Sequence, residues 1–184
     1  SVHDTALILP GFVIPSHYDA EAWKIHTVDL FDYFVEPIRS NLREKSMRKA
    51  EPRGGKIDYD IDGRLVGNWF SESTDGYQGG GTAQNYWNSH LSFAYHHINP
   101  TQIMISIPQS GINDQEKCNV CFGVYGVRGN TPDPKDITVN TGLVTYELVA
   151  RLYSGGDPRD DLSTYKNLDN EVLGVLLVQM LGNR

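Results

Sequence analysis

The sequence is poor in cysteine, in long apolar runs and in positive charge, and each shortage excludes a class of protein. Two cysteines cannot build a disulfide-rich scaffold. The longest apolar run, residues 172–178, is interrupted by Gly174 and falls far short of the ~20 residues that cross a membrane. Because 16 basic residues face 23 acidic ones, the net charge of −7 opposes binding to a phosphate backbone. We therefore expect no membrane span and no nucleic-acid partner.

Motifs for nucleotide and hydrolase chemistry are also missing. The sequence has no G-x-S-x-G elbow and no P-loop, and no G-x-G-x-x-G turn follows a strand and opens a helix. His90 and His96 would share a strand face, but they would lie about 20 Å apart and could not chelate one ion. The C-x-x-C pair, Cys118 and Cys121, fits two buried thiols, a local disulfide, or a redox or metal role. We expect no cofactor, with calcium as the exception discussed below.

The most regular pattern that is present lies in residues 56–70. Asp62 and Gly63 both tolerate the positive φ that a two-residue hairpin turn requires. On the incoming segment, apolar and charged residues alternate, with Ile57, Tyr59 and Ile61 between Lys56, Asp58 and Asp60. This alternation predicts an antiparallel sheet with one buried face and one charged, exposed face.

Further strands are expected at regular intervals along the chain, at residues 89–98, 102–108, 118–127 and 142–152, with a short one at 136–139. The apolar run 172–181 fits either a helix or a strand, and we favour a strand. The count then reaches eight, which predicts a mainly β fold, an antiparallel up-and-down barrel; a β-sandwich is the alternative.

The rest of the chain is expected to add an arm and a helical segment to one domain spanning residues 1–184. Residues 1–26 contain Pro10, Pro15 and little periodicity, which indicates an extended arm. Residues 27–50 carry a helical apolar stripe, with Thr27 as N-cap and basic residues predicted to form a solvated face. At Pro37 either this helix kinks or a second helix starts. Residues 56–184 would form the barrel.

Two short stretches resemble known families. Gly67-Asn68-Trp69 resembles the Gly-x-Trp element of the lipocalin and avidin-like (calycin) barrels, in which the tryptophan packs across one barrel end. Together with Asp58-Tyr59-x-Ile61, it is also similar to a hairpin of the phenolic acid decarboxylases. In that family an arginine between the glycine and the tryptophan binds the substrate carboxylate, whereas this chain has Asn68. The resemblance implies a lipocalin-like, eight-stranded barrel and does not imply decarboxylation.

The acidic residues of the same segment also allow a metal interpretation. Asp58, Asp60 and Asp62, followed by Gly63, match the first half of an EF-hand calcium loop. The twelfth position of such a loop falls on Trp69, so the bidentate acid would have to come from elsewhere. A plain hairpin and a calcium site therefore both remain as interpretations.

A band of aromatic and amide residues suggests where a ligand would bind. Aromatic rings with neighbouring amides suit a sugar or a planar molecule. Alternatively, Tyr86 and Trp87 are core residues at the start of a strand. The band comprises Tyr77, Gln78, Gln84, Asn85, Tyr86, Trp87, Asn88 and His90, and the ligand-binding candidates are Asn68, Trp69, Tyr77, Tyr86, Trp87 and His90.

These patterns lead to one main hypothesis of function and two alternatives. The first is a non-catalytic binding or accessory barrel for a small, partly apolar ligand or a protein partner. The second is an acid/base enzyme on the same barrel, using inward-facing His90, Tyr95, His96 or Glu147. The third is a calcium-dependent carbohydrate-binding module. The chain begins at Ser1 without a methionine, which is compatible with a processed secreted or periplasmic form and leaves the compartment open.

Overall fold

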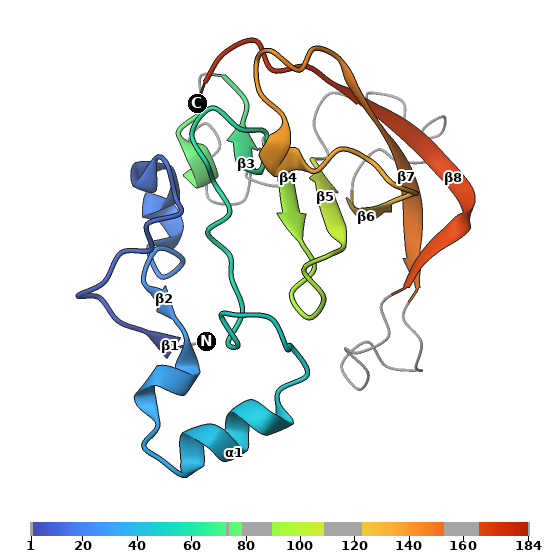
Figure 1. The fold of residues 1–184 in the computed structure, drawn as a ribbon. Helices are drawn as coiled ribbons and strands as arrows, with labels where there is room; N and C mark the ends of the chain where they lie inside the picture. Colours follow the sequence, from blue (N-terminus) through green and yellow to red (C-terminus); the bar gives the residue numbers. More distant parts are fainter. Residues whose placement is uncertain (1, 73, 79–89, 109–122, 153–165, 184) are drawn as a thin grey trace.

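The main body of the molecule is an antiparallel sheet. The computed structural model describes residues 2–72, 74–78, 90–108, 123–152 and 166–183 (Figure 1). A six-stranded sheet pairs its strands in sequence order, each antiparallel to the next: β3 (Gly67–Phe70), β4 (His90–Tyr95), β5 (Ile103–Ile107), β6 (Gly123–Val127), β7 (Val144–Leu152) and β8 (Lys166–Val178). The mainly β, antiparallel class is thus confirmed. Among the described strands, β3 and β8 end the pairing order, and no pairing between them closes a barrel.

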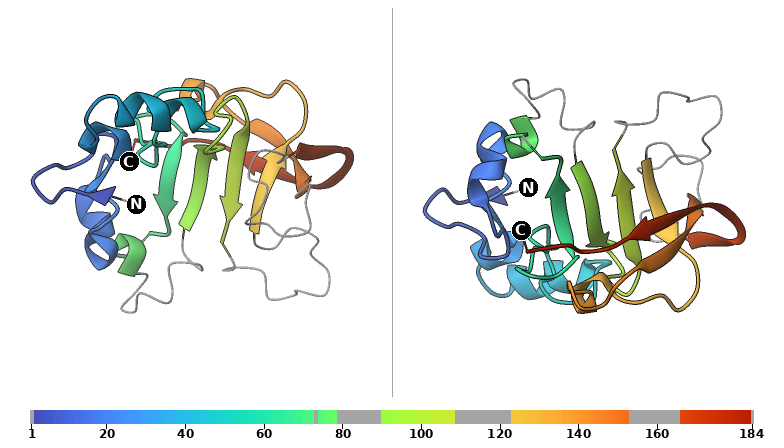
Figure 2. Two further views of the ribbon diagram at one scale, coloured as in Figure 1. Left: turned by 90° about the horizontal axis from the view of Figure 1, so that it is seen from below. Right: turned by 90° about the horizontal axis from the view of Figure 1, so that it is seen from above.

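The sheet curls around one apolar core. Phe93 of β4 pairs with Ile105 of β5, and both side chains are completely buried. Along β7, buried Val144, Tyr146 and Leu148 alternate with exposed residues, which is the period-2 pattern of a half-buried strand. Figure 2 shows the β7–β8 ribbon turning across the sheet. Met180, after β8, consequently packs in the same core as residues from the other end of the sheet.

A second, smaller layer lies beside β3 (Figure 1). It contains a two-stranded sheet of β1 (Val2–His3) and β2 (Thr27–Val28), the helix α1 (Ile38–Lys45), and the 3-10 turns η1 (Pro15–Glu21), η2 (Leu30–Tyr33) and η3 (Gly76–Gln78). Its own core joins Phe12, Tyr18 and Ile25 to Tyr77. Residues 46–66 run between this layer and the sheet.

The predicted helical segment was correct only in its second half. Thr27 lies in β2 and does not cap a helix; instead, Asp29 caps η2 by accepting a hydrogen bond from the Phe31 N–H at 2.9 Å. The α-helix begins directly after Pro37, as the alternative with a separate second helix required. Proline suits this place because the first turn of a helix needs no N–H from it.

The predicted hairpin in residues 56–70 is wrong in its first strand. Residues 56–61 form no strand, although Gly63 does adopt the positive φ of a turn, 71°. Their faces are also reversed: Ile57 and Ile61 are 42% and 47% exposed, whereas Asp58 and Asp60 are only 5% and 8% exposed. The carboxylates turn inward because they accept backbone hydrogen bonds there, as described below.

The remaining strand predictions fared better. The apolar run 172–181 is a strand as far as residue 178: β8 starts at Lys166 and ends at Val178, and residues 179–181 are not part of it. The short strand expected at 136–139 is wrong, since Pro134–Asp136 form the 3-10 turn η6, capped by Asp133. Residues 118–122 of the strand expected at 118–127 lie outside the described residues, and so do Cys118 and Cys121.

Candidate functional site

A cavity of about 500 Å³ lies between the N-terminal layer, residues 56–59 and the sheet. Its volume falls within the range that holds small-molecule ligands. Each of the three parts of the molecule contributes to the wall, so the cavity exists only when they pack together. The lining residues are Phe12, Tyr18, Trp23, Lys24, Lys56, Ile57, Tyr59, Asn68, Tyr77, Ala94, Tyr95, His96, His97, Met104 and Arg151.

Aromatic rings build one wall of this cavity. The Tyr18 ring centroid lies 4.3 Å from that of Phe12 and 5.2 Å from that of Tyr77, in the tilted geometries that aromatic pairs prefer. The Tyr18 hydroxyl accepts a hydrogen bond of 2.7 Å from the Asn68 side-chain amide. Tyr18 is only 1% exposed, so the residues packed around it fix its ring in this wall.

The charged side chains of the lining are all cationic. Among the described lining residues, Lys24, Lys56 and Arg151 carry positive charge and none is an aspartate or glutamate. The Lys24 ammonium lies 3.9 Å from the Tyr77 ring centroid and pairs with Glu21. Lys56 pairs with Asp58 at 2.8 Å. Two of the three cations in the described lining are therefore balanced by carboxylates that lie outside it.

His96 contributes a neutral imidazole to the lining. Its Nδ1 accepts hydrogen bonds from the N–H groups of Ile98, at 3.2 Å, and Asn99, at 3.0 Å. A nitrogen that accepts has no proton, so the proton of the neutral ring is on Nε2. Burial lowers the pKa of His96 to about 4, helped by the nearby charges of His97 and Arg151. Burial and Arg151 likewise lower the pKa of His97.

The buried carboxylates of Asp58 and Asp60 hold the arm against the sheet. Asp60 accepts from the Asn68 N–H at 2.8 Å and from the Val13 N–H at 3.3 Å. Asp58 accepts from the Gly11 N–H at 3.0 Å. Asp62, in contrast, is exposed. The three acids predicted to ligate calcium therefore do not converge, and two of them serve as backbone acceptors.

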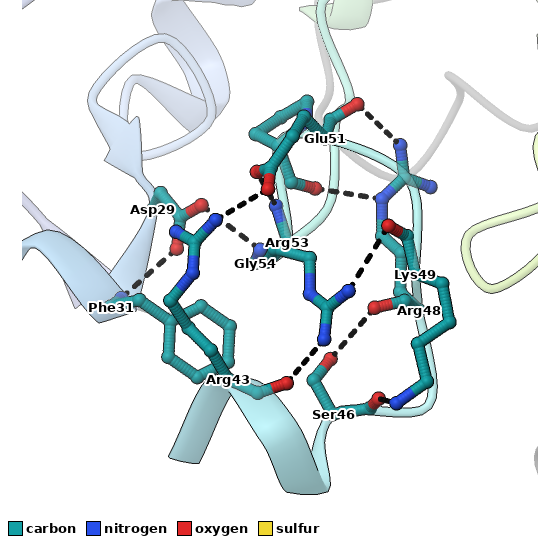
Figure 3. A network of polar contacts seen from close by, with 10 residues as sticks. Asp29, Phe31, Arg43, Ser46, Arg48, Lys49, Glu51, Arg53 and Gly54 are labelled. Carbon is teal, nitrogen blue, oxygen red and sulfur yellow. Dashed lines mark hydrogen bonds and ion pairs between the residues drawn. The ribbon is translucent and has the colours of Figure 1, made fainter. Parts of the chain in front are cut away.

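A second polar network fixes the loop after α1 (Figure 3). Arg48, 4% exposed, donates to the backbone oxygens of Pro52 and His97, both at 2.7 Å. Arg53 donates to the backbone oxygens of Lys49 and Arg43. Basic residues expected on a solvated helix face thus tie a loop to the end of β4, beside the histidines of the cavity.

Of the acid/base residues suggested by the sequence, Tyr95 and His96 line the cavity, whereas His90 and Glu147 are not among the described lining residues. The Tyr95 hydroxyl donates to Asp133, and burial together with that carboxylate raises the pKa of the tyrosine. Glu147 is exposed and lies 3.5 Å from Arg128, away from the lining. His96 has its Nδ1 engaged by backbone.

The ligand-binding candidates from the sequence divide into three groups. Asn68 and Tyr77 line the cavity. Trp69 packs against the main core, with its indole N–H donating to the Leu65 oxygen at 2.6 Å, and His90 is buried beside the rings of Phe70 and Tyr77. Tyr86 and Trp87 lie outside the described residues, as do Gln84, Asn85 and Asn88.

Sequence reasoning missed most of the lining. Tyr18, Trp23 and Lys24 lie in the arm, where no periodic pattern marks them. Arg151 lies near the end of β7, far in the sequence from the other lining residues. No sequence signal would have grouped these residues, because only the docking of the arm brings them together.

The described residues contain neither a metal-ligand cluster nor a membrane-spanning helix, and the chain matches no known protein in three comparisons. Within the described residues, no group of three or more histidine, cysteine, aspartate or glutamate side chains could hold a metal ion. No described helix has the length and apolarity needed to cross a membrane. Comparisons with protein-family models, curated proteins and solved structures found no match.

Proposed function

We propose that this protein is a non-catalytic binding domain whose cavity takes a small, partly apolar molecule. One observation carries the proposal: a cavity of about 500 Å³ is lined by six aromatic side chains, together with Ile57, Ala94 and Met104. Rings and aliphatic groups supply the apolar contact area that a ring-bearing ligand needs, and a few polar groups orient it.

The surroundings of the cavity favour binding over catalysis. The groups best suited to acid/base chemistry are engaged: His96 Nδ1 with backbone N–H groups, Tyr95 with Asp133, and Glu147 with Arg128. The engagements of His96 and Tyr95 fix two wall residues, which preorganises a binding site at the expense of proton transfer.

We also propose that the sheet belongs to the up-and-down, lipocalin-like class of eight-stranded barrels. Successive antiparallel pairing and the shared core of Leu65 and Met180, from the two ends of the sheet, support this. A crystal structure of the full chain tests it. We expect two further strands that join β8 to β3 and close the sheet, whereas two separate sheets packed face to face would contradict the class.

Binding is tested with the fluorescent, neutral probe N-phenylnaphthylamine and a variant that fills the cavity. Ala94 lines the cavity from β4, so Ala94→Trp should occupy the space of the ligand. We expect saturable binding by the unmodified protein and loss of about tenfold in affinity in Ala94→Trp, because an overfilled site must shift to admit the probe.

The control is Ala6→Trp, which places the same side chain on an exposed part of the arm outside the lining. It should bind the probe like the unmodified protein. Absence of probe binding, or equal binding by Ala94→Trp, would contradict the proposed site.

A further inference from the structure

We propose that a second cavity binds a neutral monosaccharide through Gln102, Thr131 and Asp133. This cavity, which we call the loop cavity, has a volume of about 480 Å³. It shares no described lining residue with the cavity proposed above to take a partly apolar molecule. The two proposals can therefore be tested separately.

The register of the sheet brings two loops together around the loop cavity. Met104 of β5 pairs with Gly126 of β6, so the start of β5 lies beside the end of β6. The turn that precedes β5 supplies Thr101 and Gln102, and the loop that follows β6 supplies residues 129–131 and 133. The loop cavity is therefore formed where these two loops meet at one end of the sheet.

The lining of the loop cavity is polar and carries no unbalanced charge. Asp133 is the one charged side chain among the described lining residues, and the Lys135 ammonium lies 2.6 Å from its carboxylate. A charged ligand would lose its water without meeting an unbalanced opposite charge there, so the lining favours a neutral ligand. The polar residues of the lining are Thr101, Gln102, Asn130, Thr131 and Asp133.

The side-chain amide of Gln102 is the observation that points to a ligand. Its Oε1 atom is buried and has no hydrogen-bond partner among the described residues, although a buried polar atom without a partner costs free energy. The last torsion of a glutamine is soft, so the amide can turn toward the cavity without breaking a hydrogen bond of Oε1. There it can both donate to and accept from a hydroxyl group.

Two other polar groups of the lining are held in place and can still accept hydrogen bonds. The Thr101 hydroxyl donates to Asn99 Oδ1 at 2.8 Å, which leaves the hydroxyl oxygen as an acceptor. Oδ2 of Asp133 accepts from the Lys135 ammonium at 2.6 Å and has a second lone pair for a ligand hydroxyl. Because these bonds already fix both side chains, little freedom is lost when a ligand binds.

A neutral monosaccharide meets these requirements. Each of its hydroxyl groups can donate and accept, as the amides and hydroxyls of the lining can. Its carbon–hydrogen groups suit Ile103 and Val127, the apolar residues of the lining. An apolar ligand would leave the polar side chains without partners, and a phosphate would be repelled by Asp133.

Saturation-transfer difference nuclear magnetic resonance tests the proposal with D-glucose, D-galactose and D-mannose at millimolar concentration. We expect saturation transfer to at least one of the three sugars. In Gln102→Met, which keeps the length of the side chain but removes the amide, the affinity for that sugar should fall about tenfold. The midpoint of thermal unfolding should not fall in this variant, because Oε1 makes no hydrogen bond that the substitution could remove.

Three further variants locate the sugar. Thr131→Val keeps the shape of the side chain without its hydroxyl, so the affinity should fall about fivefold, and this variant decides the question if Gln102→Met does not fold. Gln179→Met makes the same exchange at an exposed glutamine outside the loop cavity and should bind the sugar like the unmodified protein. Ala94→Trp fills the first cavity and should also leave sugar binding unchanged.

Two kinds of result would overturn the inference. If none of the three sugars receives saturation, or if Gln102→Met and Thr131→Val bind the sugar as the unmodified protein does, the loop cavity is not a sugar site. If Ala94→Trp loses sugar binding while the two loop variants keep it, the sugar occupies the first cavity, and the inference fails as well. None of these results concerns the binding of N-phenylnaphthylamine, which tests the proposed function.

Discussion

At the residue scale, buried aspartates stabilise the fold by accepting hydrogen bonds from backbone N–H groups. Asn68 belongs to β3, the first of the six described strands in the pairing order, and its N–H donates to the Asp60 carboxylate instead of to a described neighbouring strand. The same carboxylate accepts from Val13 of the arm. A buried N–H without an acceptor costs free energy, so Asp60 stabilises the edge of the sheet and the docked arm together.

Asp60→Asn tests this role. The amide keeps the shape but has one oxygen for two N–H donors, so we expect the free energy of unfolding to fall by about 1–3 kcal/mol. Urea denaturation measures it. Asp62→Asn is the matched control, since Asp62 is exposed and the change should stay within about 0.5 kcal/mol. A calcium-dependent loss of stability in Asp62→Asn would instead restore the metal interpretation.

His96 makes stability depend on pH. Its pKa of about 4 in the folded protein lies below the ordinary 6.5. The unfolded chain therefore binds more protons between these values, and stability is lost as the pH falls through this window. His96→Asn supplies an oxygen acceptor near the position of Nδ1 without titrating.

Unfolding curves at several pH values provide the measurement. From about pH 7 to about pH 5, we expect the unmodified protein to lose more stability than His96→Asn, because only the histidine gains a proton on unfolding. Parallel curves for the two proteins would contradict a buried, neutral His96.

At the element scale, the sequence predicted the sheet well where side chains decide the structure. β7 was recognisable because inward apolar and outward polar residues alternate around Tyr146. Residues 56–61 show the same alternation but form no strand, because Asp58 and Asp60 bond backbone N–H groups through their side chains and turn inward. Local periodicity cannot reveal such partners, since Gly11 and Val13 lie 47 residues away in the chain.

The docking of η1 on η3 depends on a glycine. Gly76 has a φ of +56°, and a Cβ there would overlap the backbone oxygen of His17. We expect Gly76→Ala to destabilise the protein by about 3 kcal/mol or more, since backbone strain and steric overlap add. Binding of N-phenylnaphthylamine should weaken as well, because these turns position Tyr18 and Tyr77.

Gly129→Ala separates strain from overlap. Gly129 has a φ of +72°, but a Cβ there meets nothing within 4 Å. Its cost should therefore be limited to about 1 kcal/mol of backbone strain, with unchanged probe binding. Equal thermal unfolding of the two variants would show that η1 and η3 do not need their close approach.

At the scale of the whole molecule, the cavity is formed by the packing of three distant segments of the chain. Lys24 comes from the arm, Lys56 from the connecting segment and Arg151 from the sheet, and only the packing of these segments places the three side chains around one cavity. Of the four ligand-binding candidates that the structure describes, Asn68 and Tyr77 line it. Composition could not reveal the other lining residues, because the residues that face a cavity come from segments far apart in the sequence.

The three methionines of the chain lie in three different environments, which makes them reporters of where a ligand binds. Met104 lines the cavity, Met180 is buried in the main core, and Met47 is 44% exposed on the loop after α1. Each methyl group gives its own signal in a protein labelled with carbon-13 at methionine methyl positions.

Titration of the labelled protein with N-phenylnaphthylamine, followed by nuclear magnetic resonance, tests the central claim most directly. We expect the Met104 methyl signal to shift and saturate with the fluorescence titration, because a ring in the cavity lies against that methyl group. The Met47 and Met180 signals should stay in place. A titration in which Met104 does not move, or in which Met47 or Met180 moves instead, would contradict a ligand site in this cavity.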